Sequence, residues 1–293
     1  MTGNTGNTGN TGNTGNTGNT GNAGIQGELG GGWFIEDRAD LPFVMELDPT
    51  NAPIRFADRG SALLFGDRTW SAKWWSHLVL HDFVGTAWRA TADPAMNGPW
   101  GTINAASTRA ELNLLVNAAR DERPPAMGEI LSQDIEFISD FMGLLTITPG
   151  SHPNTYRVLH STSLIGSYAV LYFKGLRRRP RPSQLRPALL PPIPVPGHAS
   201  WPSGHATQAW LMMLSIEHVL NGVVPAGDLQ TISSNLRTLA TRIARNREIA
   251  GLHYPTDSAH GRTLAQTIAP FLTGMAAGTW FGKAVTAAKG EWQ

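Results

Sequence analysis

The predicted fold is centred on Pro202-Ser-Gly-His-Ala-Thr-Gln-Ala-Trp-Leu-Met-Met-Leu-Ser-Ile-Glu-His-Val-Leu220, in which His205–Leu220 predicts a helix. The connection before it, Pro180–Pro202, holds too many prolines for a helix or a central strand. Patterns typical of strands are scarce elsewhere, so the sequence predicts an all-α domain built around a helical bundle. The other predicted helices are Ser61–Trp88, a segment opened by the capping box Thr108-Arg-Ala-Glu111 and ended by Pro124-Pro125, Ala126–Ile147, Pro153–Arg179, Asp228–Ala250 and Pro255–Gly282. In the first of these, one face would hold Trp74, Leu78, His81 and Trp88.

Composition excludes several classes of protein. The chain has 293 residues, of which 41% are hydrophobic, enough for one large domain with a sizeable core. Lys and Arg total 23 against 22 Asp and Glu, so the net charge is only +1. Nucleic-acid or membrane-surface binding would require a larger positive excess, and neither partner is expected. The absence of cysteine excludes disulfide scaffolds, thiolate zinc sites, iron–sulfur clusters and a cysteine nucleophile.

The N-terminal region differs from the rest of the chain. Residues 2–22 are seven copies of Thr-Gly-Asn, which offer no apolar position for a stacked solenoid, so 1–24 is predicted to be a disordered tail. Residues 25–60 predict an extended arm and 61–293 a helical domain. A signal peptide pattern is not visible, and no apolar stretch reaches the roughly 20 residues that span a bilayer. A cytoplasmic location is therefore favoured.

Three clusters of chemically active residues follow one another. They are Lys174-Gly-Leu-Arg-Arg-Arg-Pro-Arg181-Pro182, then Pro202-Ser-Gly-His205, then Arg247-Glu-Ile-Ala-Gly-Leu-His253-Tyr-Pro-Thr-Asp257. They combine cations, a hydroxyl, amides at a helix start, two imidazoles and a carboxylate, which together suit a pocket for a tetrahedral oxyanion. Each cluster alone also has a structural explanation: a solvated basic face, an N-cap, a core histidine, or a carboxylate at a helix start.

The clusters resemble the signature shared by vanadium-dependent haloperoxidases and type 2 phosphatidic acid phosphatases, which include bacterial acid phosphatases. The similarity extends from about Lys174 to Asp257, under a third of the chain. The fold of that family is a helical bundle with its site at the core, in agreement with the predicted helices. One position departs from the pattern, since Asn246 stands where many of the phosphatases have serine. That position is not a principal anion ligand.

The resemblance implies a role for each motif residue. His253 would bond to vanadium in a peroxidase, as the one ligand to the metal, or attack phosphorus in a phosphatase. Asp257 would fix the tautomer of His253 by accepting a hydrogen bond from its other nitrogen. His205 would act as acid and base on the opposite side, and Lys174 would polarise peroxide. The oxygens of vanadate or phosphate would be bound by Lys174, Arg181, Ser203, Gly204 and Arg247.

Four activities fit these motifs. They are a vanadate-dependent haloperoxidase that oxidises halide with hydrogen peroxide, a phosphomonoesterase with a phosphohistidine intermediate, a membrane lipid phosphatase, and a non-catalytic oxyanion binder. The lipid phosphatase lacks its spanning helices, and two histidines with a carboxylate exceed what binding alone needs. One cage suits both remaining enzymes, because trigonal-bipyramidal vanadate resembles the transition state of phosphoryl transfer.

The stretch Pro196-Gly-His198-Ala-Ser-Trp-Pro-Ser-Gly-His-Ala-Thr-Gln208 resembles the bromoperoxidase pattern, so peroxidase is expected over phosphatase. By this resemblance His198 matches a histidine of bromoperoxidases, where chloroperoxidases carry an aromatic residue. The structural alternative is a loop histidine that caps a carbonyl. The expected cofactor is vanadate, and the expected substrates are peroxide, bromide or iodide, and an organic acceptor. The Trp-rich first helix would supply the interface of a homo-oligomer.

Overall fold

The computed structural model describes residues 65–67 and 70–293. This part of the chain is helical and contains no strand, which confirms the predicted all-α fold. The predicted tail (1–24) and arm (25–60) lie outside the described residues, and the division into three segments stays a prediction. The longer helices are α2 (Ala72–Val84), α3 (Trp88–Gly101), α4 (Ala105–Asp121), α5 (Arg123–Ile135), α6 (Ile138–Leu145), α7 (Pro153–Arg177), α9 (Gly204–Leu220), α10 (Ala226–Ile249), α11 (Pro255–Thr273) and α12 (Trp280–Lys289). The short ones are α8 (Pro182–Leu185), η4 (Pro187–Leu189) and η5 (Gly290–Trp292).

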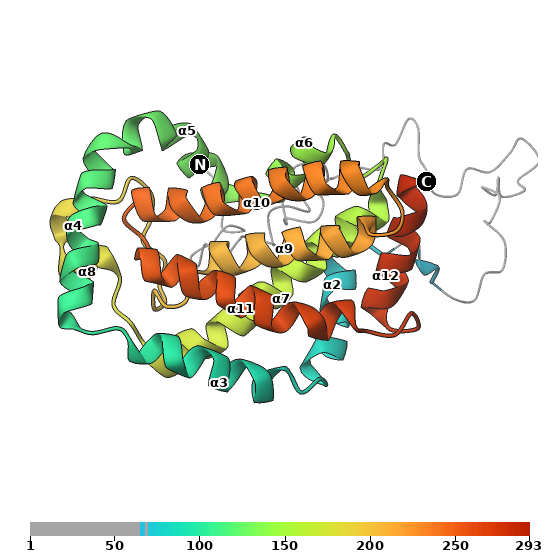
Figure 1. Ribbon diagram of the computed structural model, residues 1–293, viewed down its shortest axis with the longest axis horizontal. Helices are drawn as coiled ribbons and strands as arrows, with labels where there is room; N and C mark the ends of the chain where they lie inside the picture. The colour runs from blue at the N-terminus through green and yellow to red at the C-terminus, as the bar shows by residue number, and fades with distance from the viewer. Residues whose placement is uncertain (1–64, 68–69) are drawn as a thin grey trace, which may run out of the picture.

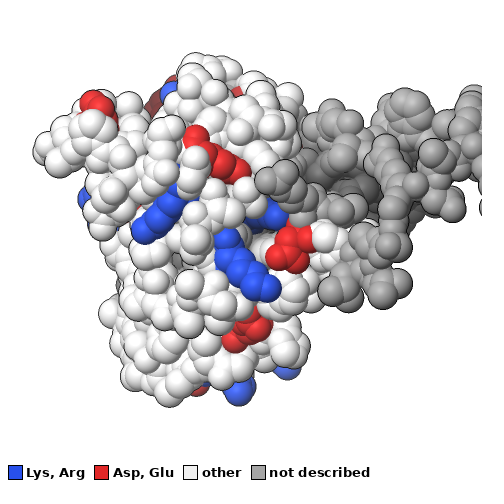
Figure 2. Space-filling model, turned by 90° about the vertical axis from the view of Figure 1, so that its right-hand side faces the viewer, with Lys and Arg blue, Asp and Glu red and all other residues white. Residues whose placement is uncertain are grey.

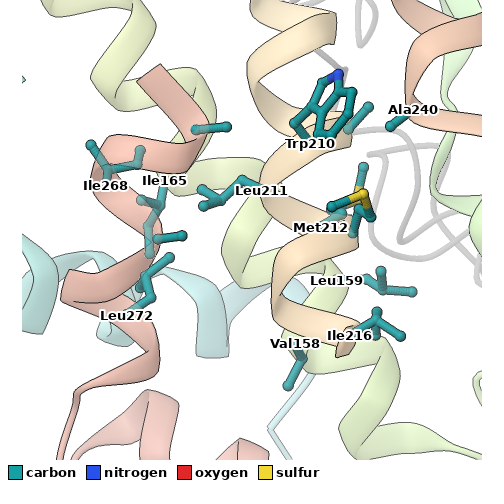
Figure 3. Close-up of a cluster of buried hydrophobic side chains, with 14 of the residues drawn as sticks. Val158, Leu159, Ile165, Trp210, Leu211, Met212, Ile216, Ala240, Ile268 and Leu272 are labelled. Atoms are coloured by element: carbon teal, nitrogen blue, oxygen red, sulfur yellow. The ribbon is translucent and has the colours of Figure 1, made fainter. Parts of the chain in front are cut away.

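Helix α9 is the centre of the bundle (Figure 1). It packs against α7, α10 and α11, while α2 and α12 cover α7 and α3 covers α11. Its sequence explains this position, because a helix that is apolar on all sides must be surrounded by other helices. Leu211 lies toward Ile165 of α7 and Ile268 of α11, whereas Trp210 lies toward Ala240 of α10 (Figure 3).

The first helical segment differs from its prediction. Helix α2 begins at Ala72, where the Ser71 side chain accepts from the Trp74 amide at 3.4 Å, and it ends before Gly85. Because the chain turns there, Trp88 belongs to α3 and cannot share a face with residues of α2. The predicted face is therefore wrong in its inclusion of Trp88, and Trp74 at its other end is 53% exposed. The buried residues of α2 are Ala72, Trp75, Ser76, Val79 and Phe83.

The predicted capping box at Thr108–Glu111 is also wrong. Helix α4 starts earlier, at Ala105, because Asn104 Oδ1 accepts from the amides of Ala106 and Ser107 at 2.9 and 3.0 Å. Glu111 therefore lies inside the helix and is buried. The predicted helices Ala126–Ile147 and Pro255–Gly282 each form two helices, with breaks at 136–137 and 274–279.

Helix α7 is capped from a distant part of the chain. Glu291 accepts from the backbone amides of Asn154 and Thr155 at 2.7 and 2.9 Å, and from both of their side chains. The carboxylate thereby satisfies amides that have no partner within the helix and complements the positive end of its dipole. The opposite end of α7 carries Lys174.

None of the helices in the described part is both long and apolar enough to cross a membrane. Figure 2 shows the end of the molecule near α12 and α2, where acidic and basic side chains are interspersed among uncharged residues.

Candidate functional site

All the residues singled out from the three motifs lie at one end of the bundle. The end of α7, the start of α9, the end of α10 and the start of α11 meet there, and α4, α5 and α8 lie around them (Figure 1). Short polar segments therefore converge where four helices begin or end. Of the predicted site residues, Arg181 directly contacts His198 and His253, and His253 contacts Asp257. The remaining members surround this group.

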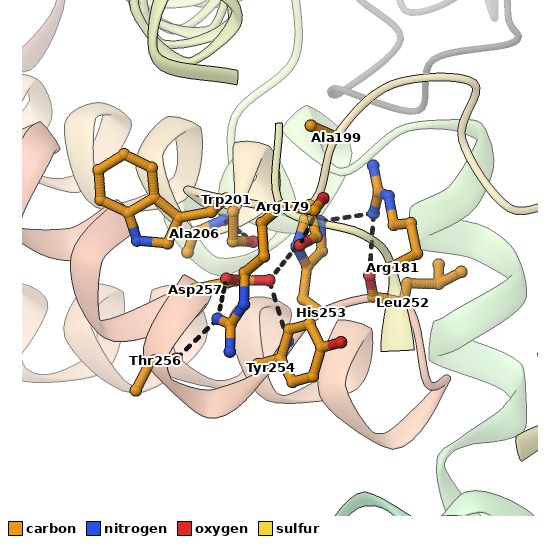
Figure 4. Close-up of polar contacts among 12 residues, drawn as sticks. Arg179, Arg181, Ala199, Trp201, Ala206, Leu252, His253, Tyr254, Thr256 and Asp257 are labelled. Carbon is orange, nitrogen blue, oxygen red and sulfur yellow. Dashed lines mark hydrogen bonds and ion pairs between the residues drawn. The ribbon is translucent and has the colours of Figure 1, made fainter. Parts of the chain in front are cut away.

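His253 is held between a carboxylate and a cation (Figure 4). Its Nδ1 lies 3.3 Å from Asp257 Oδ2, and its Nε2 lies 3.1 Å from Arg181 Nη1. Because a carboxylate only accepts and a guanidinium only donates, Nδ1 carries the proton and Nε2 presents its lone pair. Burial, followed by the nearby charges of Arg181 and Lys174, keeps the pKa of His253 well below its usual value. The ring is thus a neutral imidazole whose Nε2 lone pair accepts a hydrogen bond from Arg181.

Asp257 is fixed by a second set of contacts that the sequence analysis missed. Its Oδ1 accepts from Arg179 Nη1 at 2.6 Å, and its Oδ2 accepts from the Tyr254 amide at 3.1 Å. Arg179 also donates to Glu111 at 2.8 Å and lies 3.6 Å above the ring of Tyr254. Burial lowers the pKa of Arg179, but the carboxylates outweigh burial and raise it above its usual value. Glu111 and Arg179 are therefore positioning residues for Asp257 and, through it, for His253.

Lys174 reaches from α7 to the connection before α9. Its Nζ donates to the carbonyls of Ala199 and Ser200 at 2.6 and 2.8 Å. Burial and the nearby charge of Arg181 set the pKa of Lys174 well below its usual value. An anion beside Nζ would oppose this shift, because it stabilises the charged form.

Arg181 and Arg247 are the other two cations that were predicted to bind the anion, and both are buried. Arg181 donates to the carbonyls of His198 and Leu252 at 3.0 and 2.9 Å, and burial lowers its pKa to about 9. Arg247 donates to Asp134 at 3.3 Å, and burial lowers its pKa to about 10. Its Nε is buried without a hydrogen-bond partner. Two guanidinium groups are thus held in an environment that disfavours their charge.

Ser203 and Gly204 form the N-terminus of α9 beside these cations. The Ser203 side chain accepts from the Ala206 amide at 3.4 Å, and its amide donates to Asp257 O at 3.0 Å. The amides of Gly204 and His205 lie in the first turn and have no partner within the helix. Helix α11 can pack closely against this helix start because residue 261 is glycine: a Cβ on Gly261 would lie 2.7 Å from Ser203 O. This helix start is suited to an anion.

His205 lies in the same neighbourhood but makes different contacts. Its Nε2 donates to Gln133 O at 3.1 Å, and its ring lies 4.8 Å from that of Phe137. The donated proton leaves Nδ1 as the basic nitrogen of the neutral ring. Burial, with the charge of Arg247 next in size, keeps the pKa of His205 well below its usual value.

His198 lies at the edge of the site and is partly buried. Its Nδ1 lies 3.1 Å from Arg181 Nη2 and 3.1 Å from Ala199 O. A cleft of about 710 Å³ opens beside it, and its lining includes Lys174, Arg181 and His198. The side chain is thus placed between this opening and the buried cations.

No group of three or more His, Cys, Asp or Glu residues that could hold a metal ion exists among the described residues. The donors present suit an oxyanion, because they are mainly cations and amides around one imidazole. No protein-family model matches the chain, and no curated protein is significantly similar to it. The functional assignment therefore depends on these residues and their geometry.

Proposed function

We propose that this protein is a vanadate-dependent haloperoxidase that oxidises bromide and iodide with hydrogen peroxide. The reaction consumes peroxide, halide and one proton, and it yields hypohalous acid and water. The observation that carries the proposal is the convergence of three buried cations on a neutral, carboxylate-supported His253. The proposed class of protein is the one indicated by the motif resemblance.

The donor set fits vanadate. The oxygens would be bound by Lys174, Arg181, Ser203, Gly204 and Arg247. One unit charge pair at a separation of about 4 Å is worth roughly 4 kcal/mol at an effective dielectric constant near 20, before the cost of desolvation. Several cations are therefore needed to remove a multiply charged anion from water. The unpartnered Arg247 Nε and the pKa values of Lys174 and Arg181, lowered by burial, support the fit, since an anion would stabilise all three groups.

His253 would bind the metal through Nε2, because Asp257 accepts the proton of Nδ1. Arg181 Nη1, which donates to Nε2 in the structure, would then donate to a vanadate oxygen instead. Bound vanadate would supply Lewis-acid activation of peroxide without a change in its own oxidation state. Lys174 would supply positive charge where negative charge develops on peroxide oxygen. His198 would influence the same region through Arg181 and its own protonation.

His205 suits the peroxidase, and it would also serve the alternative activity, a phosphomonoesterase that acts through a phosphohistidine. A peroxidase needs a base that takes a proton from peroxide, and the neutral ring with an unprotonated Nδ1 suits that role. A phosphatase would use the protonated ring to donate to the leaving group, and a bound phosphate would favour that charged form. His253 Nε2 would serve either chemistry.

The test divides one preparation of the full chain into two. One half is loaded with vanadate and assayed for bromination with peroxide, and the other is assayed without vanadate on a phosphate monoester. We expect bromination and little ester hydrolysis. Rapid ester hydrolysis without bromination would assign the phosphatase activity instead.

The cage is tested with Lys174→Ala and Arg247→Ala, and Arg237→Ala on the exposed face of α10 is the matched control. Each cage variant should lose vanadate on dialysis, whereas the control should retain it. Retention of vanadate by a cage variant would show that these cations do not bind it.

A further inference from the structure

A second cleft of about 550 Å³ adjoins the first. It lies between the end of α3, the start of α4, the end of α7 and α8, and it shares Arg178, Arg179 and Pro180 with the cleft beside His198. We call it the arginine cleft, because its lining contains Arg109, Arg177, Arg178, Arg179 and Arg186. Its volume is in the range typical of small-molecule sites.

The charge of the arginine cleft is unbalanced. None of the described residues that line the cleft is Asp or Glu. Only Arg179 forms ion pairs, with Glu111 and Asp257, and none of the other four arginines is paired with a carboxylate of the described residues. Four cations around one concave surface with no carboxylate in its lining attract an anion.

Some polar atoms in the lining have no hydrogen-bond partner among the described residues. Arg177 Nε and Tyr254 Oη are buried without a hydrogen bond. The Arg177 side chain is nevertheless held in place, because it donates to Asn97 and its guanidinium lies 5.5 Å from the centre of the Trp100 ring. A donor that is fixed but unsatisfied is expected where a ligand supplies the acceptor.

Most of the remaining lining is apolar and includes Trp100, Ile103, Leu112 and Leu185, with Asn104 and Thr108 as polar neighbours. An inorganic ion would leave this surface in contact with water. A ligand with an aromatic or aliphatic body would cover it while its acidic group paired with the arginines.

We propose that the arginine cleft binds an amphipathic organic anion, with a carboxylate, sulfonate or phosphate group near Arg109 and Arg177 and an apolar body against Trp100. Binding here requires neither vanadate nor turnover. The proposal is therefore independent of the haloperoxidase assignment, and the two can fail separately.

The probe is 1-anilinonaphthalene-8-sulfonate, whose fluorescence reports binding and whose sulfonate cannot be hydrolysed as an ester. It is titrated into the full chain and into Arg109→Gln, Arg177→Gln and the charge-conserving Arg177→Lys. Arg237→Gln, an exposed arginine of α10, is the control. We expect saturable binding that weakens roughly tenfold in each Gln variant, by less in Arg177→Lys, and not in the control.

Two further titrations separate this cleft from other sites. The uncharged analogue N-phenyl-1-naphthylamine should bind more weakly than the sulfonate and equally to all variants. Sulfonate binding should be unchanged in Lys174→Ala, because Lys174 lines the neighbouring site and not the arginine cleft. Unchanged sulfonate affinity in Arg109→Gln, whose side chain is exposed and whose folding is checked by circular dichroism, would refute the proposal, as would a loss of affinity in Lys174→Ala equal to that in the Gln variants.

Discussion

Replacing Arg179 with methionine tests whether the Glu111–Arg179–Asp257 network holds the site together. Arg179 is 4% exposed, and its guanidinium contacts the two carboxylates at 2.8 and 2.6 Å. Methionine retains much of the volume but leaves both carboxylates buried without their cation. Removing one partner of a buried pair costs about 3–5 kcal/mol, a large share of the roughly 5–15 kcal/mol that stabilises a typical domain.

The loss of stability should depend on pH. Burial without a cation favours the neutral form of a carboxyl group, so the folded variant binds protons more readily than its unfolded chain. The deficit should be complete near neutral pH and shrink as the pH falls toward about 4, where carboxyl groups ordinarily take up protons.

Urea denaturation at several pH values measures this difference. Adding Glu111→Gln to the Arg179→Met variant should recover part of the loss, because only one uncompensated carboxylate remains. Arg120→Met is the matched control, since Arg120 pairs with Asp121 on the exposed surface and should matter little. A deficit below about 1 kcal/mol, or one that does not change with pH, would refute the reasoning.

Three further outcomes are expected. Burial, with a smaller effect of Lys73, lowers the pKa of His160 from 6.5 to about 3, so the folded state resists its protonation and stability falls as the pH drops below 6.5. The contribution of His160 should reach about 2 kcal/mol at pH 5, and it is measured by urea denaturation as the difference in pH dependence between the original protein and His160→Phe, in which the other buried histidines are unchanged. Gly261→Ala should destabilise by about 1–3 kcal/mol and weaken vanadate binding in equilibrium dialysis, because the new Cβ would lie 2.7 Å from Ser203 O; unchanged binding would contradict the close packing. His198→Ala should lower bromination while vanadate affinity is largely retained, since Arg181 keeps its bond to Leu252 O, and an unchanged rate across about pH 5–8 would assign His198 a structural role.

The central helices could be predicted because their boundaries have local causes. Proline opens α11, Ser203 caps α9 and Pro180 closely follows the end of α7, so the ends that carry the motif residues are expected within two residues of their observed positions. Once those ends meet, the motif residues necessarily share one region. The order and spacing of the three motifs along the sequence therefore predict which residues lie together in the site, although they do not predict how the side chains contact one another.

The network that supports Asp257 could not be predicted in the same way. Glu111 lies 68 residues from Arg179 and 145 from Thr256, and no local pattern pairs positions that far apart. Its apparent role in a capping box was misleading, because Asn104 competes as the cap and starts the helix earlier. Arg179 is the last of three consecutive arginines, and the sequence does not show which of the three side chains is buried. The partner of Arg247, Asp134, is likewise 113 residues away.

The cap that Glu291 provides for α7 should affect the resistance of the protein to proteolysis. The residue that caps one end of α7 belongs to the short helix η5 and is partly exposed, whereas Lys174 lies about five turns further along α7. Cleavage just before Glu291 would leave every residue of the site in the chain, yet it would expose the first amides of α7 and ease local opening. The contact that protects the fold and the lysine that belongs to the site thus lie at opposite ends of α7.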